Sequence, residues 1–193
     1  MNSHDLIMKS KDKKVKSSVD NFESPDFYNL DNLLSEEHIM IRSSIRDFVK
    51  KEISPFIEDW SEKNYFPSEI VRKMGEIGIF GPTTSEKYGG GGLDYISYGI
   101  IMQEIERGDS GMRSTASVQS SLVMFPIEEY GSEEQKNKFL PKLASGKILG
   151  CFGLTEPDHG SNPSGMKTKC EDKGDYYLLN GSKMWISNSP EAD

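Results

Sequence analysis

The spacing of the apolar residues changes once along this chain, at about residue 147. Before that point apolar residues recur three or four positions apart, which is the spacing of one face of an α-helix. After it, short β-rich runs alternate with turn signals, as in β-strands. Helices followed by strands predict an α+β fold in which the two kinds of element are segregated, or lie in separate domains.

The first predicted helix begins after Ser35, a residue type that favours the N-cap position. It should stop at Ser54, because the residue before a proline avoids the helical region. A second helix opens at Pro67 and ends at Gly78, which suits the position after a helix. The residues predicted to face inward from these two helices are Ile41, Ile45, Phe48, Val49, Ile70, Val71, Met74 and Ile77.

A loop from residue 81 to 92 ends in four consecutive glycines. The Lys-Ser/Thr pair of a phosphate-binding P-loop does not follow, so we predict a flexible turn. Three more helices are predicted: one over 94–107, one over 114–124 that breaks before Pro126, and one that starts at a capping box, Ser132 with Gln135. Their predicted inward residues are Ile96, Ile100, Ile101, Ile105, Phe139, Leu140 and Leu143.

In the second part we predict strands over 148–154 and 183–187, with a hairpin of 167–171 and 176–179 between them. Three such strands make a poor isolated sheet, so the chain is expected to stop inside a domain. The predicted division is a disordered tail over 1–30, a helical domain over 31–147 and the incomplete beginning of an antiparallel β domain over 148–193.

The net charge of −8 disfavours nucleic acid as a partner, because phosphates would be repelled. No apolar run approaches the roughly 20 residues that span a bilayer. The lysine-rich start lacks the apolar core of a signal peptide, so a cytoplasmic location is expected. Cys151 and Cys170 lack metal-binding spacing and are expected to be reduced thiols, and the scattered histidines indicate no zinc site.

Two segments carry residues suited to binding a ligand. Residues 152–161 form a loop rich in small and hydroxyl-bearing residues, which exposes backbone N–H groups to polar ligand atoms. Residues 180–188 place Trp185, with its flat apolar face, next to the hydroxyl of Ser187. Taken from the residues alone, an ordinary β-sandwich core with a buried tryptophan is the interpretation that the residues favour.

Together the two segments read "TEP..GS" and then "NG.K.WI.N", with a hairpin between them. This pattern, over about residues 33–193, resembles the acyl-CoA dehydrogenase family and implies a bound FAD. The residues that the resemblance places around the flavin are Phe152, Gly153, Leu154, Thr155, Glu156, Pro157, Gly160, Ser161, Trp185, Ile186 and Ser187.

Within that set, the resemblance implies that Thr155 hydrogen-bonds the flavin edge near its reactive nitrogen and that Ser161 also contacts the acyl-CoA. Two positions depart from the family pattern: Asn162 replaces an aspartate, and Ser187 replaces a threonine. Both replacements keep hydrogen-bonding capacity, so weaker tuning rather than lost binding is expected.

A third segment, Glu104–Arg107 with Gly111–Ser114, resembles the subfamily that oxidises glutaryl-CoA, as does "GCFGLTEP" from Gly150. The resemblance implies that Arg113 and Ser114 bind the distal carboxylate of the substrate, with Glu106 in the surrounding polar network. The physical reason is that a buried carboxylate needs a partner, and a charge-assisted bond to arginine stabilises it by about 1.5–3 kcal/mol. A surface arginine is the open alternative.

The implied reaction is FAD-dependent oxidative decarboxylation of glutaryl-CoA to crotonyl-CoA and CO2, with electrons passed to electron-transfer flavoprotein. The glutamate base is expected beyond Asp193, so we assign no catalytic residue and no metal, and expect these 193 residues alone to be inactive. A homotetramer is implied for the full-length protein. The alternatives are another short- or branched-chain acyl-CoA dehydrogenase, or a truncated, non-catalytic binding module.

Overall fold

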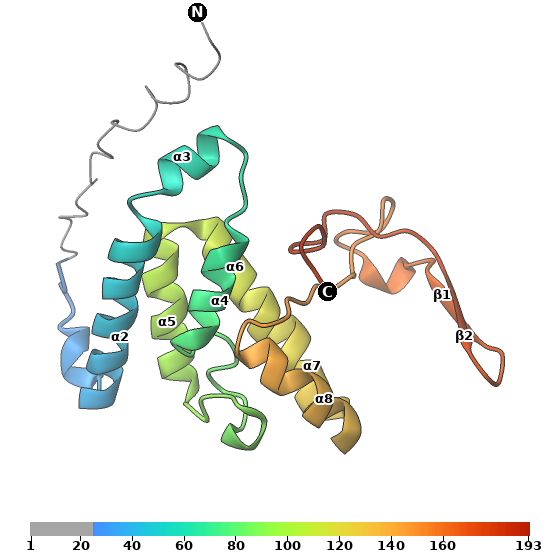
Figure 1. The fold of residues 1–193 in the computed structure, drawn as a ribbon, viewed down its shortest axis with the longest axis horizontal. Helices are drawn as coiled ribbons and strands as arrows, with labels where there is room; N and C mark the ends of the chain where they lie inside the picture. The colour runs from blue at the N-terminus through green and yellow to red at the C-terminus, as the bar shows by residue number, and fades with distance from the viewer. Residues whose placement is uncertain (1–24) are drawn as a thin grey trace, which may run out of the picture.

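The computed structural model describes residues 25–193, so most of the predicted tail lies outside the described residues. Helices pack together on one side, and a segment with one hairpin projects from them (Figure 1). In chain order the elements are η1 (Leu30–Leu33), α2 (Glu36–Phe48), η2 (Val49–Ile53), α3 (Ile57–Glu62), α4 (Ser68–Glu76), η3 (Glu86–Tyr88), α5 (Tyr95–Gly108), α6 (Ser110–Ser117), η4 (Val118–Met124), α7 (Phe125–Tyr130), α8 (Glu133–Ala144), η5 (Pro163–Gly165), β1 (Lys169–Asp172) and β2 (Tyr177–Asn180).

The capping residues begin their helices as predicted. The Ser35 hydroxyl accepts a hydrogen bond from the backbone N–H of His38, and the Ser35 N–H donates to the His38 ring. Ser132 and Gln135 form the same reciprocal arrangement at the start of α8. Each box satisfies backbone donors that the first turn of a helix leaves unpaired.

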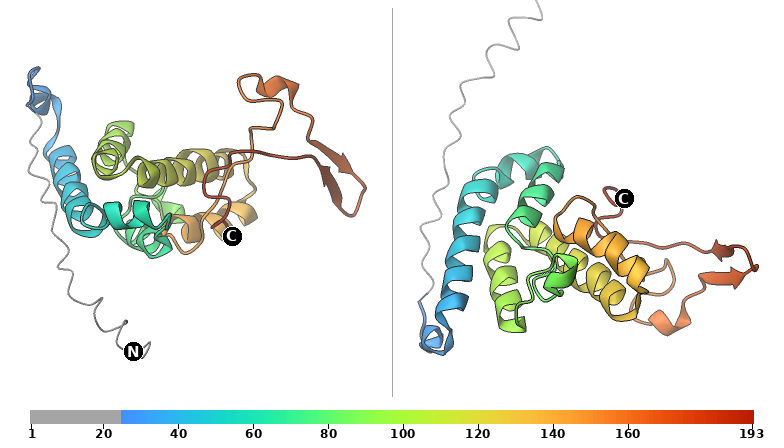
Figure 2. Two further views of the ribbon diagram at one scale, coloured as in Figure 1. Left: turned by 90° about the horizontal axis from the view of Figure 1, so that it is seen from above. Right: turned by 60° about the horizontal axis from the view of Figure 1, so that its bottom comes forward.

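Most of the predicted inward residues form one core between α2, α4, α5, α6 and α8, and Figure 2 shows these helices gathered in one body. Two predictions were wrong: Ile77 is 42% exposed and Ile96 is 54% exposed. Ile77 caps the end of α4, immediately before Gly78 turns the chain with a left-handed φ of 79°. Ile96 lies in the first turn of α5, outside the stripe that buries Ile100, Ile101 and Ile105.

The fourth helix differs from the prediction at both ends. It begins at Ser110, where Asp109 caps it by accepting from the Met112 N–H, and it continues through Pro126 instead of breaking there. The π-helical turn η4 lies before Pro126, which stands in the first turn of α7. Pro126 has no N–H to donate, and the π-helical turn directly before it interrupts the regular α-helical hydrogen-bond pattern at this point.

The glycine-rich loop forms a compact, hydrogen-bonded turn. The N–H groups of Gly91 and Gly92 donate to the carbonyls of Gly81 and Thr84, at 3.1 and 2.8 Å. A side chain on Gly90 would collide with the Thr84 backbone. These glycines therefore allow close backbone packing.

The predicted hairpin is confirmed: β1 and β2 pair antiparallel, with Lys169 opposite Asn180 and Asp172 opposite Tyr177. The strands predicted over 148–154 and 183–187 are not present in the described residues. Trp185 has a left-handed φ of 59°, which a regular strand does not permit. No described helix combines the length and apolar character needed to cross a membrane.

Candidate functional site

Two of the segments predicted to bind a cofactor meet at a small cavity of about 220 Å³. Val118 and Leu122 of η4 form one apolar wall. The rest of the lining comes from six of the predicted cofactor residues: Phe152, Leu154, Thr155, Trp185, Ile186 and Ser187. The fold thus brings together residues that lie more than 30 positions apart in the chain.

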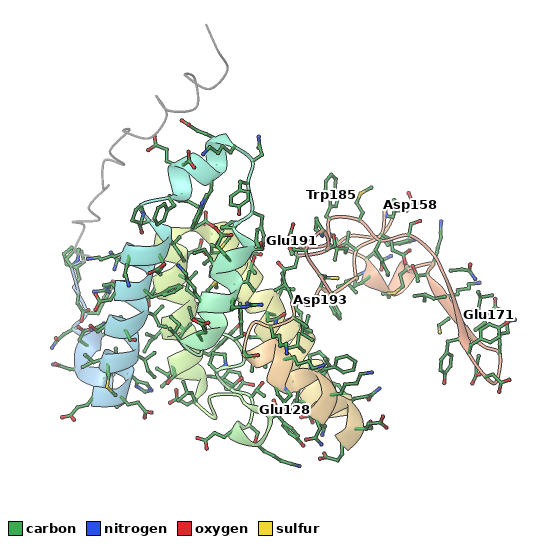
Figure 3. All side chains as sticks on the ribbon, in the orientation of Figure 1. Glu128, Asp158, Glu171, Trp185, Glu191 and Asp193 are labelled. Atoms are coloured by element: carbon green, nitrogen blue, oxygen red, sulfur yellow. The ribbon has the colours of Figure 1, made fainter. Side chains whose placement is uncertain are left out.

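The composition of this cavity matches the ring part of a flat cofactor. Its walls are apolar and aromatic, and Thr155 and Ser187 add two hydroxyl groups. Trp185 is 85% exposed and lies on the projecting segment, where Figure 3 labels it. Because none of the described lining residues is charged, the cavity suits a ring system rather than phosphate groups.

The remaining predicted cofactor residues do not line this cavity. Gly160 and Ser161 lie further along the loop and are exposed, as is Pro157. Gly153 lies against Lys183: a Cβ added to Gly153 would stand 3.3 Å from the Cγ of that side chain.

Unlike the other residues of this loop, Glu156 is buried, and its carboxylate is hydrogen-bonded within the protein. It is 6% exposed and accepts from the backbone N–H groups of Lys167 and Thr168, at 2.7 and 2.9 Å. The Lys183 amine donates to it at 3.0 Å. These hydrogen bonds, the one from Lys167 first, hold the pKa of the Glu156 carboxyl well below its usual range. The carboxylate organises the loop.

Lys183 holds the same loop, although the sequence predicted no role for this residue. Besides Glu156, its amine donates to the backbone carbonyl of Leu154 at 3.0 Å. The following N–H, of Met184, donates to the carbonyl of Thr155 at 2.9 Å. The lysine stands in the second quoted segment, which was the one available signal of its importance.

Gln119 is a second residue that the sequence did not reveal. It is fully buried in η4, and its amide nitrogen donates to the carbonyls of Leu143 and Ile148, at 3.0 and 2.9 Å. Its amide oxygen accepts from the Gly150 N–H at 2.8 Å. Gln119 therefore fixes the start of the segment that leads into the cavity wall.

The residues predicted to bind a distal carboxylate divide between two places. The Arg113 Nε donates to Glu106, and one of its terminal nitrogens lies 3.5 Å from the Ser117 hydroxyl. The Arg113 guanidinium, and then the Ser110 hydroxyl, lower the pKa of the Glu106 carboxyl. Both charged side chains are partly exposed. Ser114 instead faces a larger cavity.

That larger cavity has a volume of about 670 Å³ and lies between α3, α6 and residues 187–191. Trp60 and Tyr65 supply aromatic surface, and Ser114 and Thr115 supply hydroxyl groups. Ser187 lines both cavities, so the two adjoin at this residue. Figure 3 shows Glu191, which also lines the larger cavity, beside the helices.

The chain matches two known domain families in succession. Residues 35–147 match the acyl-CoA dehydrogenase N-terminal domain, and residues 151–193 match the acyl-CoA dehydrogenase middle domain. Glutaryl-CoA dehydrogenase of Desulfococcus multivorans is 46% identical over 85% of this chain and 43% of its own length. Short-chain specific acyl-CoA dehydrogenase of Rattus norvegicus is 40% identical over 82% of this chain and 39% of its own length.

Solved structures agree with these relatives. A glutaryl-CoA dehydrogenase of Mycobacterium smegmatis in complex with FADH2 has a TM-score of 0.84 and 48% identity, over 86% of this chain and 43% of that one. A glutaryl-CoA dehydrogenase complex with glutaryl-CoA has a TM-score of 0.80 and 47% identity, over 83% of this chain and 41% of that one. A chain from a structure of the electron transferring flavoprotein of Acidaminococcus fermentans has a TM-score of 0.80 and 41% identity, over 83% of this chain and 42% of that one.

The chain spans less than half the length of these relatives. Both of its parts, however, match domains of one family in order, and a relative is 46% identical over 85% of the chain. It belongs to the acyl-CoA dehydrogenase family.

Proposed function

We propose that the full-length protein containing this chain is an FAD-dependent acyl-CoA dehydrogenase that oxidises glutaryl-CoA to crotonyl-CoA and CO2. The observation that carries the proposal is that the small cavity lined by Thr155 and Trp185 (the slot) adjoins, at Ser187, the larger cavity lined by Ser114. A dehydrogenation of this kind needs a redox ring and an acyl chain in contact, and two adjoining cavities provide that arrangement.

FAD would supply the acceptor for the hydride that leaves the substrate. Phe152, Trp185 and Ile186 would enclose its ring, and the hydroxyls of Thr155 and Ser187 would meet its polar edge. The apolar walls would exclude water from the reacting atoms. The relative solved with FADH2 supports this cofactor.

Arg113, beside Ser114, would bind the distal carboxylate of the substrate. A guanidinium has five N–H donors in a planar fork, so it can hold Glu106 and a second carboxylate together. The relative solved with glutaryl-CoA supports a dicarboxylic substrate. Electron-transfer flavoprotein is the proposed electron acceptor, which the match from the Acidaminococcus structure supports. Homotetrameric assembly and a cytoplasmic location stay predictions from the sequence.

The direct test is turnover of glutaryl-CoA by the full-length protein, with an artificial electron acceptor and with electron-transfer flavoprotein. Crotonyl-CoA is the expected product. Glutaconyl-CoA in its place would mean that dehydrogenation occurs without loss of CO2. No turnover of any acyl-CoA by a flavin-loaded protein would contradict the proposal and favour a binding module.

Another acyl-CoA dehydrogenase with a different acyl group is the nearest alternative, and the match to a short-chain enzyme favours it. Arg113→Ala separates the two, because only a dicarboxylic substrate needs the guanidinium. A large loss with glutaryl-CoA and a small one with butyryl-CoA would support the glutaryl assignment. Arg72→Ala, at an exposed position of α4, is the control and should affect neither substrate.

A further inference from the structure

A buried ion pair ties together the two segments that form the flavin slot. The Lys183 amine lies 3.0 Å from the Glu156 carboxylate, and their side chains are 23% and 6% exposed. Glu156 is the one buried residue among the described residues from 150 to 193. A charged group is rarely buried in a region so poor in core unless its position serves the surrounding structure.

The pair acts on the backbone next to Thr155. The amine of Lys183 also donates to the Leu154 carbonyl at 3.0 Å, while the lysine stem crosses Gly153, where a side chain would press against it. The Met184 N–H holds the carbonyl of Thr155. The peptide groups on both sides of Thr155 are therefore fixed by two consecutive residues, Lys183 and Met184.

The geometry of a peptide group passes this constraint on to Thr155. In a trans peptide the carbonyl of Leu154 and the N–H of Thr155 lie in one plane and point in opposite directions. A cation on that carbonyl thus orients the N–H and strengthens it as a donor, because hydrogen bonds in a chain polarise one another. Within residues 25–193, the Thr155 N–H has no hydrogen-bond acceptor.

We propose that Lys183, anchored by Glu156, is a positioning residue that aims and polarises the Thr155 N–H toward the cofactor ring and so favours the reduced, electron-rich ring over the oxidised one. The inference rests on the proposed FAD site. Lys183 does not line the slot, so its effect passes through the Leu154–Thr155 peptide.

The test compares Lys183→Met with Arg46→Met in the flavin-loaded full-length protein. Arg46 is the matched control because it also pairs with a buried carboxylate, Glu104, at 2.7 and 2.8 Å, but between α2 and α5. Arg107 lies 3.4 Å from the same carboxylate. Glu104 therefore still has a positively charged partner when Arg46 is replaced. The readouts are the flavin midpoint potential, its visible absorbance spectrum and the melting temperature.

Lys183→Met is expected to weaken binding of reduced flavin relative to oxidised flavin by about tenfold, which lowers the midpoint potential by about 30 mV. It should also shift the absorbance spectrum. Arg46→Met should lower the melting temperature and leave both flavin readouts unchanged.

If Lys183→Met fails to fold, the double variant Glu156→Gln/Lys183→Met removes the unpaired buried charge, and the same shift is expected. A lower melting temperature with an unchanged potential and spectrum would overturn the inference, since the pair would then be only structural. A wild-type protein that binds no FAD would overturn the proposed function as well, so the two failures are distinguishable.

Discussion

The helical part and the strand part of the molecule are held together by different forces. Between Ile45 and Leu149 a continuous set of apolar side chains is buried, and several of them have no exposed surface. From residue 150 onward no described apolar side chain is buried, and both strands of the hairpin are exposed throughout. The helices are thus stabilised by burial of apolar surface, and the segment that reaches away from them in Figure 2 is held by polar contacts.

The two parts are joined by hydrogen bonds around residues 149 and 150. Gln119 accepts from the Gly150 N–H, and the Asn188 amide donates to the Gly150 carbonyl at 3.2 Å. The N–H of Leu149 donates to the Asp193 carboxylate at 2.9 Å. The cavity lined by Thr155 and Trp185 therefore lies where a core of buried apolar side chains meets a segment that is held by directed polar contacts.

The largest effect is expected from one substitution made in each part. Leu140→Ala removes a leucine with no exposed surface and should lower the free energy of unfolding by about 3 kcal/mol, because it leaves a cavity. Leu179→Ala, at a leucine that is 68% exposed, should change it by less than about 0.5 kcal/mol. Urea unfolding followed by circular dichroism measures both. Similar losses of unfolding free energy for the two variants would contradict the difference between the helical part and the strand part.

The next largest effect is expected at the junction between the two parts, the hydrogen bonds around residues 149 and 150. Gln119→Leu keeps the volume but leaves the Ile148 carbonyl and the Gly150 N–H without this partner, while the Leu143 carbonyl still accepts from the Gly146 N–H. The variant should cost about 2 kcal/mol of unfolding free energy. Gln103→Leu, at an exposed position of α5, is the control and should be close to neutral. Hydrogen exchange at Gly150 should also accelerate in the first variant. Unchanged exchange there would show that Gln119 does not hold the junction.

A smaller effect is expected at the start of α8. Ser132→Ala removes the hydroxyl that accepts from the Gln135 N–H and should cost about 1 kcal/mol in thermal or urea unfolding. Ser132→Asp keeps an acceptor at the cap and should restore most of the loss. In the strand part, Ser164→Ala removes a hydrogen bond to Asn162 and should have no measurable effect on the same curve.

The smallest global effect should come from pH, and it should be confined to the strand part. The folded pKa of Glu156 lies below its ordinary value of 4.5, so its stabilising effect is complete above that pH and is lost as the pH falls further. Amide exchange at Lys167 and Thr168 should therefore lose protection below pH 4.5. Glu156→Gln should remove the pH dependence. Protection that persists at low pH in the wild type would contradict this assignment.

The sequence predicted the elements whose signals are local. Helix starts at Ser35 and Ser132 and the hairpin around residues 173–176 followed from residues within a few positions of one another. It failed at Ile96 and at Pro126, because helical spacing does not say which turn faces the core and a π-helical turn can precede a proline.

In the candidate site, too, some features followed from local sequence and others only from the tertiary structure. The quoted motifs identified six residues that share one slot, and from their pattern alone the chain could be assigned to a flavin-dependent family. The tertiary structure alone decided that Glu156 accepts from Lys183, 27 residues away, and that Gln119 holds Gly150, 31 residues away. Caps and turns are determined within one turn of chain, whereas the partner of a buried polar group depends on how distant segments pack.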